Sequence, residues 1–300
     1  MKILHNINLW KKSTIWIWWE AKYYCEAKRE WDLMNARNFA KKNDLWIIFF
    51  WIWSNILFSQ NIENKLVCRI KNNFFEKISE NEEFWLFKVW SWTILWNLIN
   101  ILIKDNFDLT NLAWFPSTIW WAIVWNAWLC WSEMKDFLVS AKILNLKTWK
   151  YEEWKNEDFE FEYRNSKIKK IINQNKNKSE NNFIISSCIL KIPKTRLNKE
   201  DWLKLKLTRN LQERADKQPK WRSAWSFFKN PYPHFAWKLI EQIWLKWFKI
   251  WWAYFSWKHA NFLMTKEWVT IKDILKLRNL AKRKVKDEFW VDLEEEIVIY

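Results

Sequence analysis

Residues 113–128 read Ala-Trp-Phe-Pro-Ser-Thr-Ile-Trp-Trp-Ala-Ile-Val-Trp-Asn-Ala-Trp. They lie in a run of 24 uncharged residues, 109–132, which is long enough to cross a membrane. When each Trp is replaced by Gly, the run becomes a glycine-rich loop with Pro116 inside it, and such loops present backbone N–H groups to a ligand. The function of this stretch therefore depends on what its tryptophans represent.

The composition has the same ambiguity over the whole chain. The 300 residues include 31 Trp and 0 Gly, whereas average usage of about 7% predicts roughly 21 Gly. Glycine supplies positive φ at turns and helix ends, so a chain of many elements does not dispense with it. We therefore interpret Trp as standing in the place of Gly throughout. Our hypothesis for the cause is a UGA codon that means glycine and was translated as tryptophan.

Several tryptophans occupy positions where glycine is favoured. Trp149 lies between two strand-like runs, as the turn of a hairpin would. Trp290 follows the amphipathic stretch 270–289, whose start resembles a capping box, and is therefore predicted to be the residue just past the helix end. Trp244 ends the shorter stretch 236–243 in the same way.

The net charge and the cysteine content exclude few classes of function. A net charge of +16 suggests a nucleic-acid or membrane partner, but AT-rich coding also enriches Lys, and a nucleotide diphosphate substrate suits the charge as well. The four cysteines form no CxxC pair and have no His pair nearby, which favours a reduced, metal-free cytosolic protein. The first residues lack an apolar export signal, so we expect a cytoplasmic location. The cysteines are Cys25, Cys68, Cys130 and Cys188.

The chain is predicted to have three regions and a closing strand. Region 1–68 has a helix near 32–42 and a strand at 47–50, and Trp51-Ile52-Trp53-Ser54-Asn55 follows that strand directly. With Gly for Trp, this loop can offer N–H groups to a pyrophosphate, although an ordinary tight turn has the same pattern. Region 69–192 has a β-rich run to Val89, a helix near 94–104, the stretch quoted above, a hairpin and a polar, mobile insertion at 173–182. Region 193–290 precedes an acidic strand in 291–300.

These motifs, in this order and spacing, resemble one family, the UDP-N-acetylenolpyruvoylglucosamine reductases (MurB). The Phe-Lys-Asn-Pro, Lys-His-Ala-Asn-Phe and Tyr-Arg-x-Ser matches stand as written, whereas the others need the Gly interpretation. The matching segments are 17–19, 51–55, 113–128, Tyr163-Arg164-x-Ser166, Gln218-Pro219, 224–231, 239–241, 258–262 and Leu293-Glu294-x-Glu296.

The resemblance implies an α+β fold with a two-subdomain FAD-binding part of the vanillyl-alcohol-oxidase (PCMH) type and a C-terminal α+β substrate domain. Its parts would be subdomains 1–68 and 69–192, the substrate domain 193–290, and a strand, 291–300, that carries Glu296. It also implies non-covalent FAD, NADPH as hydride donor and UDP-N-acetylglucosamine enolpyruvate as substrate in peptidoglycan synthesis, without a nucleic-acid, membrane or metal partner. The length resembles the shorter of the family's two forms.

The resemblance also implies site residues. Arg164 and Glu296 would stabilise the charge that develops on the substrate, and Ser226 would donate a proton. Substrate would be held by Tyr163, Lys229, Asn230, His259 and Asn261. FAD would be held by Trp51, Ile52, Trp53, Ser54, Asn55, Ala113, Trp114, Pro116, Ser117, Thr118, Trp120, Trp121, Ala122 and Asn126.

Taken one at a time, these residues have ordinary structural explanations. Glu296 belongs to an acidic run, which is usually a solvated surface, and Arg164 alone would be a surface cation. Ser226 alone would be a turn former, and His259 fits a structural role equally well. Two other functions remain open: another flavoenzyme on the same scaffold, and a basic Trp-rich protein that stacks single-stranded nucleic acid.

Overall fold

The computed structural model describes residues 1–9, 15, 17, 20–50, 56–57, 64–71, 75–80, 83–113, 117–129, 132–174, 183–194, 200–219 and 222–299. The chain divides into two compact units. The first contains residues 1–3, 24–51 and 65–214, and the second contains residues 4–23, 52–64 and 215–300. The predicted boundaries at 68, 192 and 290 stay a prediction.

A four-stranded sheet and one helix form the N-terminal part of the chain. Its strands are β1 (Ile3–Asn8), β2 (Glu20–Ala27), β5 (Lys65–Ile70) and β3 (Trp46–Phe50), in the order β1-β2-β5-β3 with β3 and β5 parallel. Helix α1 (Glu30–Lys42) starts where Asp32 accepts hydrogen bonds from the backbone N–H groups of Lys28 and Arg29. The helix predicted near 32–42 and the strand predicted at 47–50 are confirmed.

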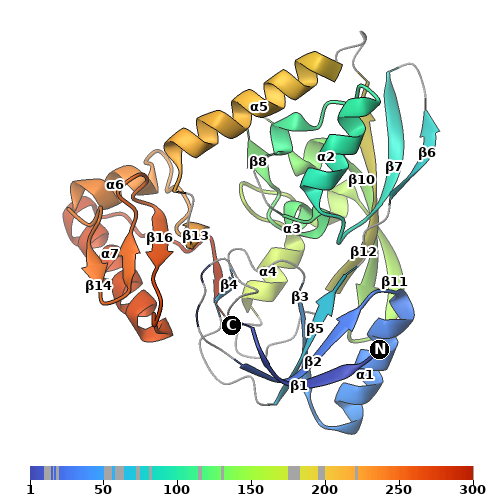
Figure 1. Ribbon diagram of the computed structural model, residues 1–300, viewed down its shortest axis with the longest axis horizontal. Helices are drawn as coiled ribbons and strands as arrows, with labels where there is room; N and C mark the ends of the chain where they lie inside the picture. The colour runs from blue at the N-terminus through green and yellow to red at the C-terminus, as the bar shows by residue number, and fades with distance from the viewer. Residues whose placement is uncertain are drawn as a thin grey trace. The chain divides into compact units, whose positions relative to one another are not determined.

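A five-stranded antiparallel sheet belongs to the first unit (Figure 1). Its order is β11 (Lys150–Lys155), β10 (Leu138–Asn145), β12 (Phe183–Pro193), β7 (Phe84–Trp90) and β6 (Phe75–Glu80). Helices α2 (Leu95–Lys104), α3 (Ile119–Val124) and α4 (Lys167–Gln174) belong to the same unit, as do the short elements η2 (Thr110–Leu112), β8 (Trp128–Leu129), β9 (Ser132–Glu133), η3 (Met134–Asp136) and η4 (Asn156–Phe159). Helix α5 (Glu200–Lys217) follows.

The second unit packs two helices against a small sheet. The sheet has the order β13 (Ser223–Ser226), β16 (Phe262–Thr265), β15 (Ala253–Phe255) and β14 (Lys249–Ile250), and the helices are α6 (Ala236–Gln242) and α7 (Ile271–Phe289) (Figure 1). Strand β17 (Val298–Ile299) pairs in parallel with β4 (Ile56–Leu57). Buried apolar side chains from both helices and the sheet form one core that includes Phe227, Phe228, Leu239, Ile274 and Leu277.

Helix α7 has the ends that the sequence predicts. Thr270 accepts a hydrogen bond from the N–H of Asp273, and the Asp273 carboxylate accepts one from the N–H of Thr270, so the capping box is confirmed. At the other end, Trp290 has φ 60° and its N–H donates to the Lys286 carbonyl oxygen at 2.9 Å. The positive φ values predicted for the hairpin turn at Trp149 and for Trp244 are also present, at 57° and 61°.

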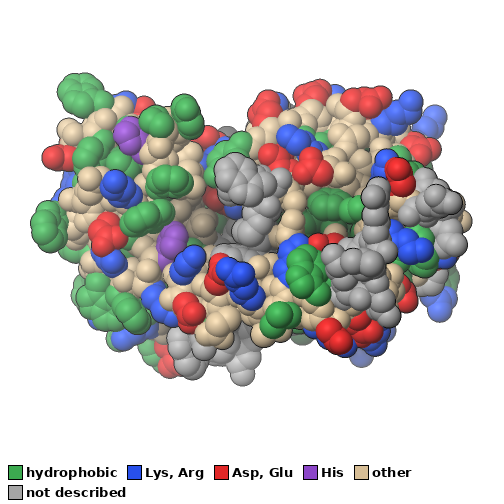
Figure 2. All heavy atoms as spheres, turned by 90° about the horizontal axis from the view of Figure 1, so that it is seen from above, with side chains coloured by type: hydrophobic (Ala, Val, Ile, Leu, Met, Phe, Trp, Pro, Cys, Tyr) green, Lys and Arg blue, Asp and Glu red, His purple; other side chains and the backbone are tan. Residues whose placement is uncertain are grey.

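Left-handed backbone is found at several of the described tryptophans. Twelve described residues have positive φ, and six of them are Trp149, Trp244, Trp247, Trp251, Trp268 and Trp290. The left-handed region costs a residue with a Cβ roughly 1–2 kcal/mol, and the exposed indoles of Trp244 (87%) and Trp290 (84%) recover little by packing. Figure 2 shows exposed hydrophobic side chains, in green, among the charged ones on one face of the molecule. These positions behave as glycine positions, in agreement with the Gly interpretation.

The uncharged run 109–132 and the polar insertion predicted at 173–182 do not form single long elements in the described residues. Within the first run, the described residues form η2, α3 and β8 rather than one long helix. Among all described residues, no helix is long and apolar enough to cross a membrane. Of the predicted insertion, Asn173 and Gln174 end α4, and 175–182 lie outside the described residues.

Candidate functional site

Arg164 lies at the third position of a tight turn in the first unit. The turn, Glu162 to Asn165, is closed by two backbone hydrogen bonds of 3.1 Å between its end residues. Arg164 has φ 54°, as the third residue of a type II turn requires, although glycine is the usual residue there. The Nε and Nη1 atoms of Arg164 are buried, and Tyr163 beside it is exposed. The surrounding structure thus holds Arg164 in a backbone conformation that is unfavourable for a residue with a Cβ.

Side chains from the glycine-rich stretch and from the Ser of Tyr-Arg-x-Ser hold this turn. The Ser166 hydroxyl donates to the Val124 carbonyl oxygen at 2.7 Å and accepts from the N–H of Lys169 at 3.3 Å, which starts α4. The Asn126 amide donates to the Glu162 carbonyl oxygen at 3.1 Å. The two motifs are therefore one structural unit.

Asn126 was expected to bind FAD, and its polar atoms contact protein groups. Besides Glu162, its amide nitrogen donates to the Glu133 carboxylate at 2.6 Å, and its Oδ1 accepts from the N–H of Lys135 at 3.1 Å. Asn126 has φ 42°, a region that Asn tolerates better than most residues. We expect it to affect a cofactor through the shape of this segment.

Ser226 and Glu296 come together in the second unit through backbone pairing. The N–H of Glu296 donates to the Phe227 carbonyl oxygen at 2.9 Å, and the N–H of Lys229 donates to the Glu294 carbonyl oxygen at 2.8 Å. Phe228 and Glu295 form an antiparallel bridge between these two bonds. The proposed proton donor and the proposed carboxylate therefore lie on adjacent extended segments.

The three consecutive glutamates have different environments. Glu294 is exposed and its carboxylate lies 2.6 Å from the Lys229 ammonium. Glu295 points to α7, where Lys282 and Arg278 contact its carboxylate at 3.1 Å and 3.5 Å. Glu296 is 5% exposed. A carboxylate buried to this extent is not part of a solvated acidic surface, so the ordinary explanation of Glu296 does not apply.

Two of the predicted substrate-binding amides also contact the backbone. Both polar atoms of buried Asn261 bond to Phe228, with Oδ1 accepting from its N–H at 2.9 Å and Nδ2 donating to its carbonyl at 2.7 Å. Asn230 Oδ1 accepts from the N–H of Ala236, the first residue of α6, at 3.0 Å. Asn261 therefore holds the segment that follows Ser226, and we expect it to influence substrate through that segment.

His259 has an apolar environment. Its ring lies 4.6 Å from the Phe262 ring and 6.3 Å from the Trp237 ring, measured between centroids. The buried Nδ1 has no hydrogen-bond partner among the described residues. Burial lowers the pKa of His259 to about 4, so the ring is neutral near pH 7.

The described part of the cofactor stretch is buried. Ala113, Ser117, Thr118, Trp120, Trp121 and Ala122 are all buried, and the Thr118 hydroxyl accepts from the N–H of Trp121 at 3.4 Å at the start of α3. The Ser117 hydroxyl is buried and has no partner among the described residues, as expected of a group that bonds to a ligand. Residues 51–55, Trp114 and Pro116 lie outside the described residues.

Large aromatic rings pack against one another within the same stretch. The Trp121 ring stacks on the Trp125 ring at 5.2 Å, and Trp120 lies 6.2 Å from Trp125. All three indoles occur at positions interpreted as Gly. The stretch thus fits FAD when these residues are glycine, because the volume that the three indoles occupy within it is then free.

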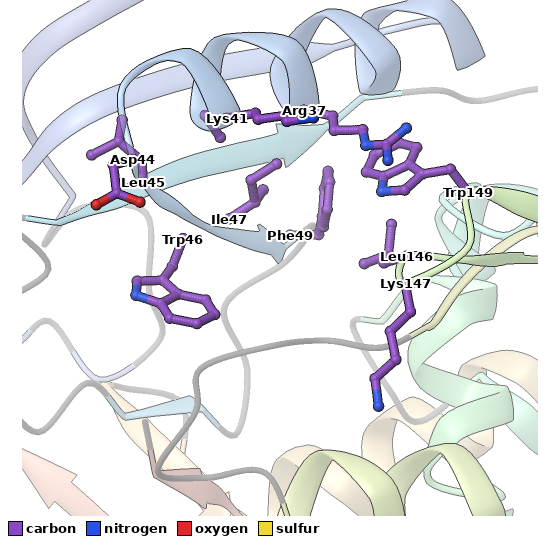
Figure 3. Close-up of a pocket in the computed structure, with 11 residues that line it drawn as sticks. Arg37, Lys41, Asp44, Leu45, Trp46, Ile47, Phe49, Leu146, Lys147 and Trp149 are labelled. Atoms are coloured by element: carbon purple, nitrogen blue, oxygen red, sulfur yellow. The ribbon is translucent and has the colours of Figure 1, made fainter.

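A cavity of about 340 Å³ lies elsewhere in the first unit (Figure 3). It is lined by α1, β3 and the β10–β11 turn, and the Arg37 guanidinium lies 4.5 Å from the Trp149 ring centroid. None of the predicted site residues that the structure describes lines it. Since Trp149 is a left-handed residue and forms one wall, the cavity depends on an indole at a glycine-like position.

Sequence reasoning overlooked Lys169. This lysine is 1% exposed, and its ammonium donates to the Arg164 carbonyl oxygen at 2.9 Å. The available signal was helical spacing, because Lys169 lies on the same face of α4 as Ile168 and Ile172, which are both buried. Among the described residues, no group of three or more His, Cys, Asp or Glu side chains is arranged to hold a metal ion.

Known proteins resemble this chain over its whole length. The family model for the C-terminal domain of UDP-N-acetylenolpyruvoylglucosamine reductase matches residues 217–300. The reductase of that name from Aquifex aeolicus is 28% identical over 299 residues, 99% of this chain and 95% of the relative. The one from Prochlorococcus marinus is 29% identical over 97% of this chain and 95% of the relative. The one from Petrotoga mobilis is 32% identical over 67% of this chain and 62% of the relative.

The fold has a counterpart among solved structures. The crystal structure of UDP-N-acetylenolpyruvylglucosamine reductase (MurB) from Thermus caldophilus matches with a TM-score of 0.76 and 20% identity, over 100% of this chain and 99% of that one. The expected α+β architecture, an FAD-binding part with a C-terminal α+β domain, is thereby confirmed. With the motifs in order and relatives that match end to end, the chain belongs to the UDP-N-acetylenolpyruvoylglucosamine reductase family.

Proposed function

We propose that this chain is the FAD-dependent reductase that uses NADPH to convert UDP-N-acetylglucosamine enolpyruvate to UDP-N-acetylmuramate in peptidoglycan precursor synthesis. One observation of the structure carries the proposal. The segment after Ser226 pairs with the segment that contains Glu296, so the backbones that carry this hydroxyl and this buried carboxylate are hydrogen-bonded to each other. A proton donor and an acidic residue held on one hydrogen-bonded framework suit the protonation of an enolate-like species.

The residues divide the work as follows. Residues 51–55 and the stretch from Ala113 to Asn126 would hold FAD non-covalently, and the bound flavin would supply hydride transfer from NADPH to the enolpyruvyl CH₂ carbon. Arg164 and Glu296 stabilise the negative charge that develops next to the substrate carboxylate. The Ser226 hydroxyl donates a proton to the carbon adjacent to that carboxylate.

Substrate binding falls to residues near Arg164 or Ser226 in the chain, and to His259 and Asn261. Tyr163, Lys229 and Asn230 lie beside Arg164 or shortly after Ser226 in the chain. The Lys229 ammonium, which pairs with exposed Glu294, can exchange this surface partner for a substrate anion, since surface ion pairs contribute little to stability. His259 and Asn261 would influence substrate indirectly. Asn261 does so by holding Phe228, two residues after Ser226.

The partners and location follow from the same function. The diphosphate of the substrate and the phosphates of NADPH are anions that a net charge of +16 attracts. We therefore assign the basic surface to nucleotide substrates rather than to nucleic acid or a membrane, and we expect the reductase to act in the cytoplasm without a metal.

An anaerobic assay of the protein made with glycine at all 31 Trp positions tests the proposal. The purified protein should be yellow, and it should oxidise NADPH only when UDP-N-acetylglucosamine enolpyruvate is present, giving a product heavier by two hydrogen atoms. The chain as written is the control and should bind little FAD, because indoles at Trp120, Trp121 and Trp125 fill the stretch. A rate of NADPH oxidation that does not depend on this substrate contradicts the proposed reaction. Equal FAD content in the two proteins contradicts the steric argument.

A further inference from the structure

Lys169 is a buried cation on an apolar helix face. It is 1% exposed, and its neighbours Ile168 and Ile172 on α4 are also buried. Lysine is almost never buried to this extent unless its ammonium has a partner, because removal of the charge from water is unfavourable. The position of the ammonium is therefore informative.

The Lys169 ammonium points to the turn that carries Arg164. It donates a hydrogen bond to the Arg164 carbonyl oxygen at 2.9 Å and lies 4.6 Å from the centroid of the Trp125 ring. The contact with the indole depends on the residue at position 125. The hydrogen bond does not, since it joins the lysine to a backbone atom.

This bond acts where the backbone is strained. Arg164 has φ 54°, and such a conformation in a non-glycine residue persists only when its surroundings enforce it. The bonds that close the turn join Glu162 and Asn165, whereas Lys169 contacts Arg164 itself. We infer that Lys169 is a positioning residue, whose buried ammonium holds the Arg164 backbone so that the guanidinium meets the substrate. The inference rests on the role of Arg164 in the proposed function.

The same helix provides a matched control. Lys167 lies two residues before Lys169, is exposed, and pairs with Glu160 at 2.8 Å outside the turn. Exposed pairs of this kind contribute little to stability. Loss of Lys167 therefore removes one positive charge from α4 without changing the backbone of Arg164.

The test uses the FAD-loaded, glycine-containing enzyme with Lys169→Met, Lys169→Arg, Lys167→Met, Arg164→Ala and the double variant Arg164→Ala/Lys169→Met. Three quantities are measured: flavin reduction by NADPH, reoxidation of the reduced flavin by UDP-N-acetylglucosamine enolpyruvate, and the Kd of that substrate from its effect on the oxidised flavin spectrum. Lys169→Met should slow reoxidation by roughly 10–10²-fold, as a misplacement of about 1 Å does, and should leave reduction by NADPH unchanged. Lys169→Arg should recover part of the loss, and Lys167→Met should have no effect.

The double variant shows whether Lys169 acts through Arg164. If it does, the double variant should reoxidise no more slowly than Arg164→Ala alone. Slow reoxidation in Arg164→Ala with a normal rate in Lys169→Met overturns this inference and leaves the proposed function intact. A normal rate in Arg164→Ala contradicts the proposed role of Arg164, and the inference is overturned with it. If Lys169→Met does not fold, Lys169→Arg decides: a loss confined to reoxidation supports the inference, and an equal loss in both half-reactions overturns it.

Discussion

The N–H of Glu296 donates a hydrogen bond to the carbonyl oxygen of Phe227, at 2.9 Å, and Phe227 directly follows Ser226. Asn261 holds the next residue, Phe228, by both of its backbone polar groups. Ser226 and Glu296 are therefore attached to one hydrogen-bonded framework rather than to independent loops. Since catalytic groups need positions accurate to a fraction of an ångström, this framework has direct consequences for substitutions.

Replacement of Ser226 should separate the two half-reactions. Ser226→Ala should leave flavin reduction by NADPH intact and slow reoxidation by the enolpyruvyl substrate by ~10²–10⁴-fold, the usual contribution of a general acid. Ser226→Cys should recover part of the rate, because a thiol can donate a proton from nearly the same position. Rapid-mixing absorbance of pre-reduced enzyme measures this, and near-normal reoxidation by Ser226→Ala removes Ser226 from the mechanism.

Removal of Arg164 or Glu296 should also slow reoxidation of the flavin by substrate without slowing its reduction by NADPH. Arg164→Ala and Glu296→Ala should each bind FAD and accept hydride from NADPH, with kcat for the full reaction lower by ~10²-fold or more. Glu295→Ala is the control for Glu296, because its carboxylate contacts Lys282 and Arg278 on α7 instead. If flavin reduction by NADPH falls to the same degree, Arg164 and Glu296 are structural or bind nicotinamide.

Alanine should reveal which tryptophan positions require glycine. In the protein made with glycine at all 31 positions, alanine at position 290 should lower the free energy of unfolding by about 1 kcal/mol, because it forces a Cβ into the left-handed region. Alanine at position 202, within helix α5, should raise it by about 1 kcal/mol. Urea unfolding of both variants gives the signs, and equal signs would count against the glycine interpretation.

The intact mass of the protein from its native source tests the same interpretation without mutagenesis. Glycine in place of tryptophan removes the indole ring at each position, so the measured mass should fall several kilodaltons below 37.6 kDa. The codon at Trp53 should be UGA. Agreement with 37.6 kDa, or a UGG codon at Trp53, would show that the tryptophans are real or that the codon hypothesis is wrong.

His259 should make stability depend on pH. Its folded pKa of about 4 lies below the unfolded value of 6.5, so the unfolded state binds the proton first and stability is lost as the pH falls from 6.5 to 4. The loss should reach about 3 kcal/mol at the lower end. His259→Leu should flatten the unfolding free energy across this range, whereas exposed His234→Gln should not. An unchanged slope in His259→Leu would show that the titration belongs to other groups.

Local features of this protein could be predicted from its sequence because they depend on residues within one turn. The capping box of α7, the left-handed ends at Trp244 and Trp290, and the hairpin turn at Trp149 each follow from a few neighbouring side chains and the steric needs of the backbone. The family also followed from sequence, since its motifs survive in order even where Trp replaces Gly.

Tertiary structure alone decided which site residues meet and what each one contacts. Ser226 and Glu296 are separated by 70 residues, and only strand pairing shows that the segments that carry them are adjacent. The acidic run does not reveal that Glu296 is buried while Glu294 is exposed, and the Lys-rich α4 does not reveal that Lys169 reaches the Arg164 carbonyl. Burial and long-range hydrogen bonds depend on how distant segments pack, and no local spacing rule contains that information.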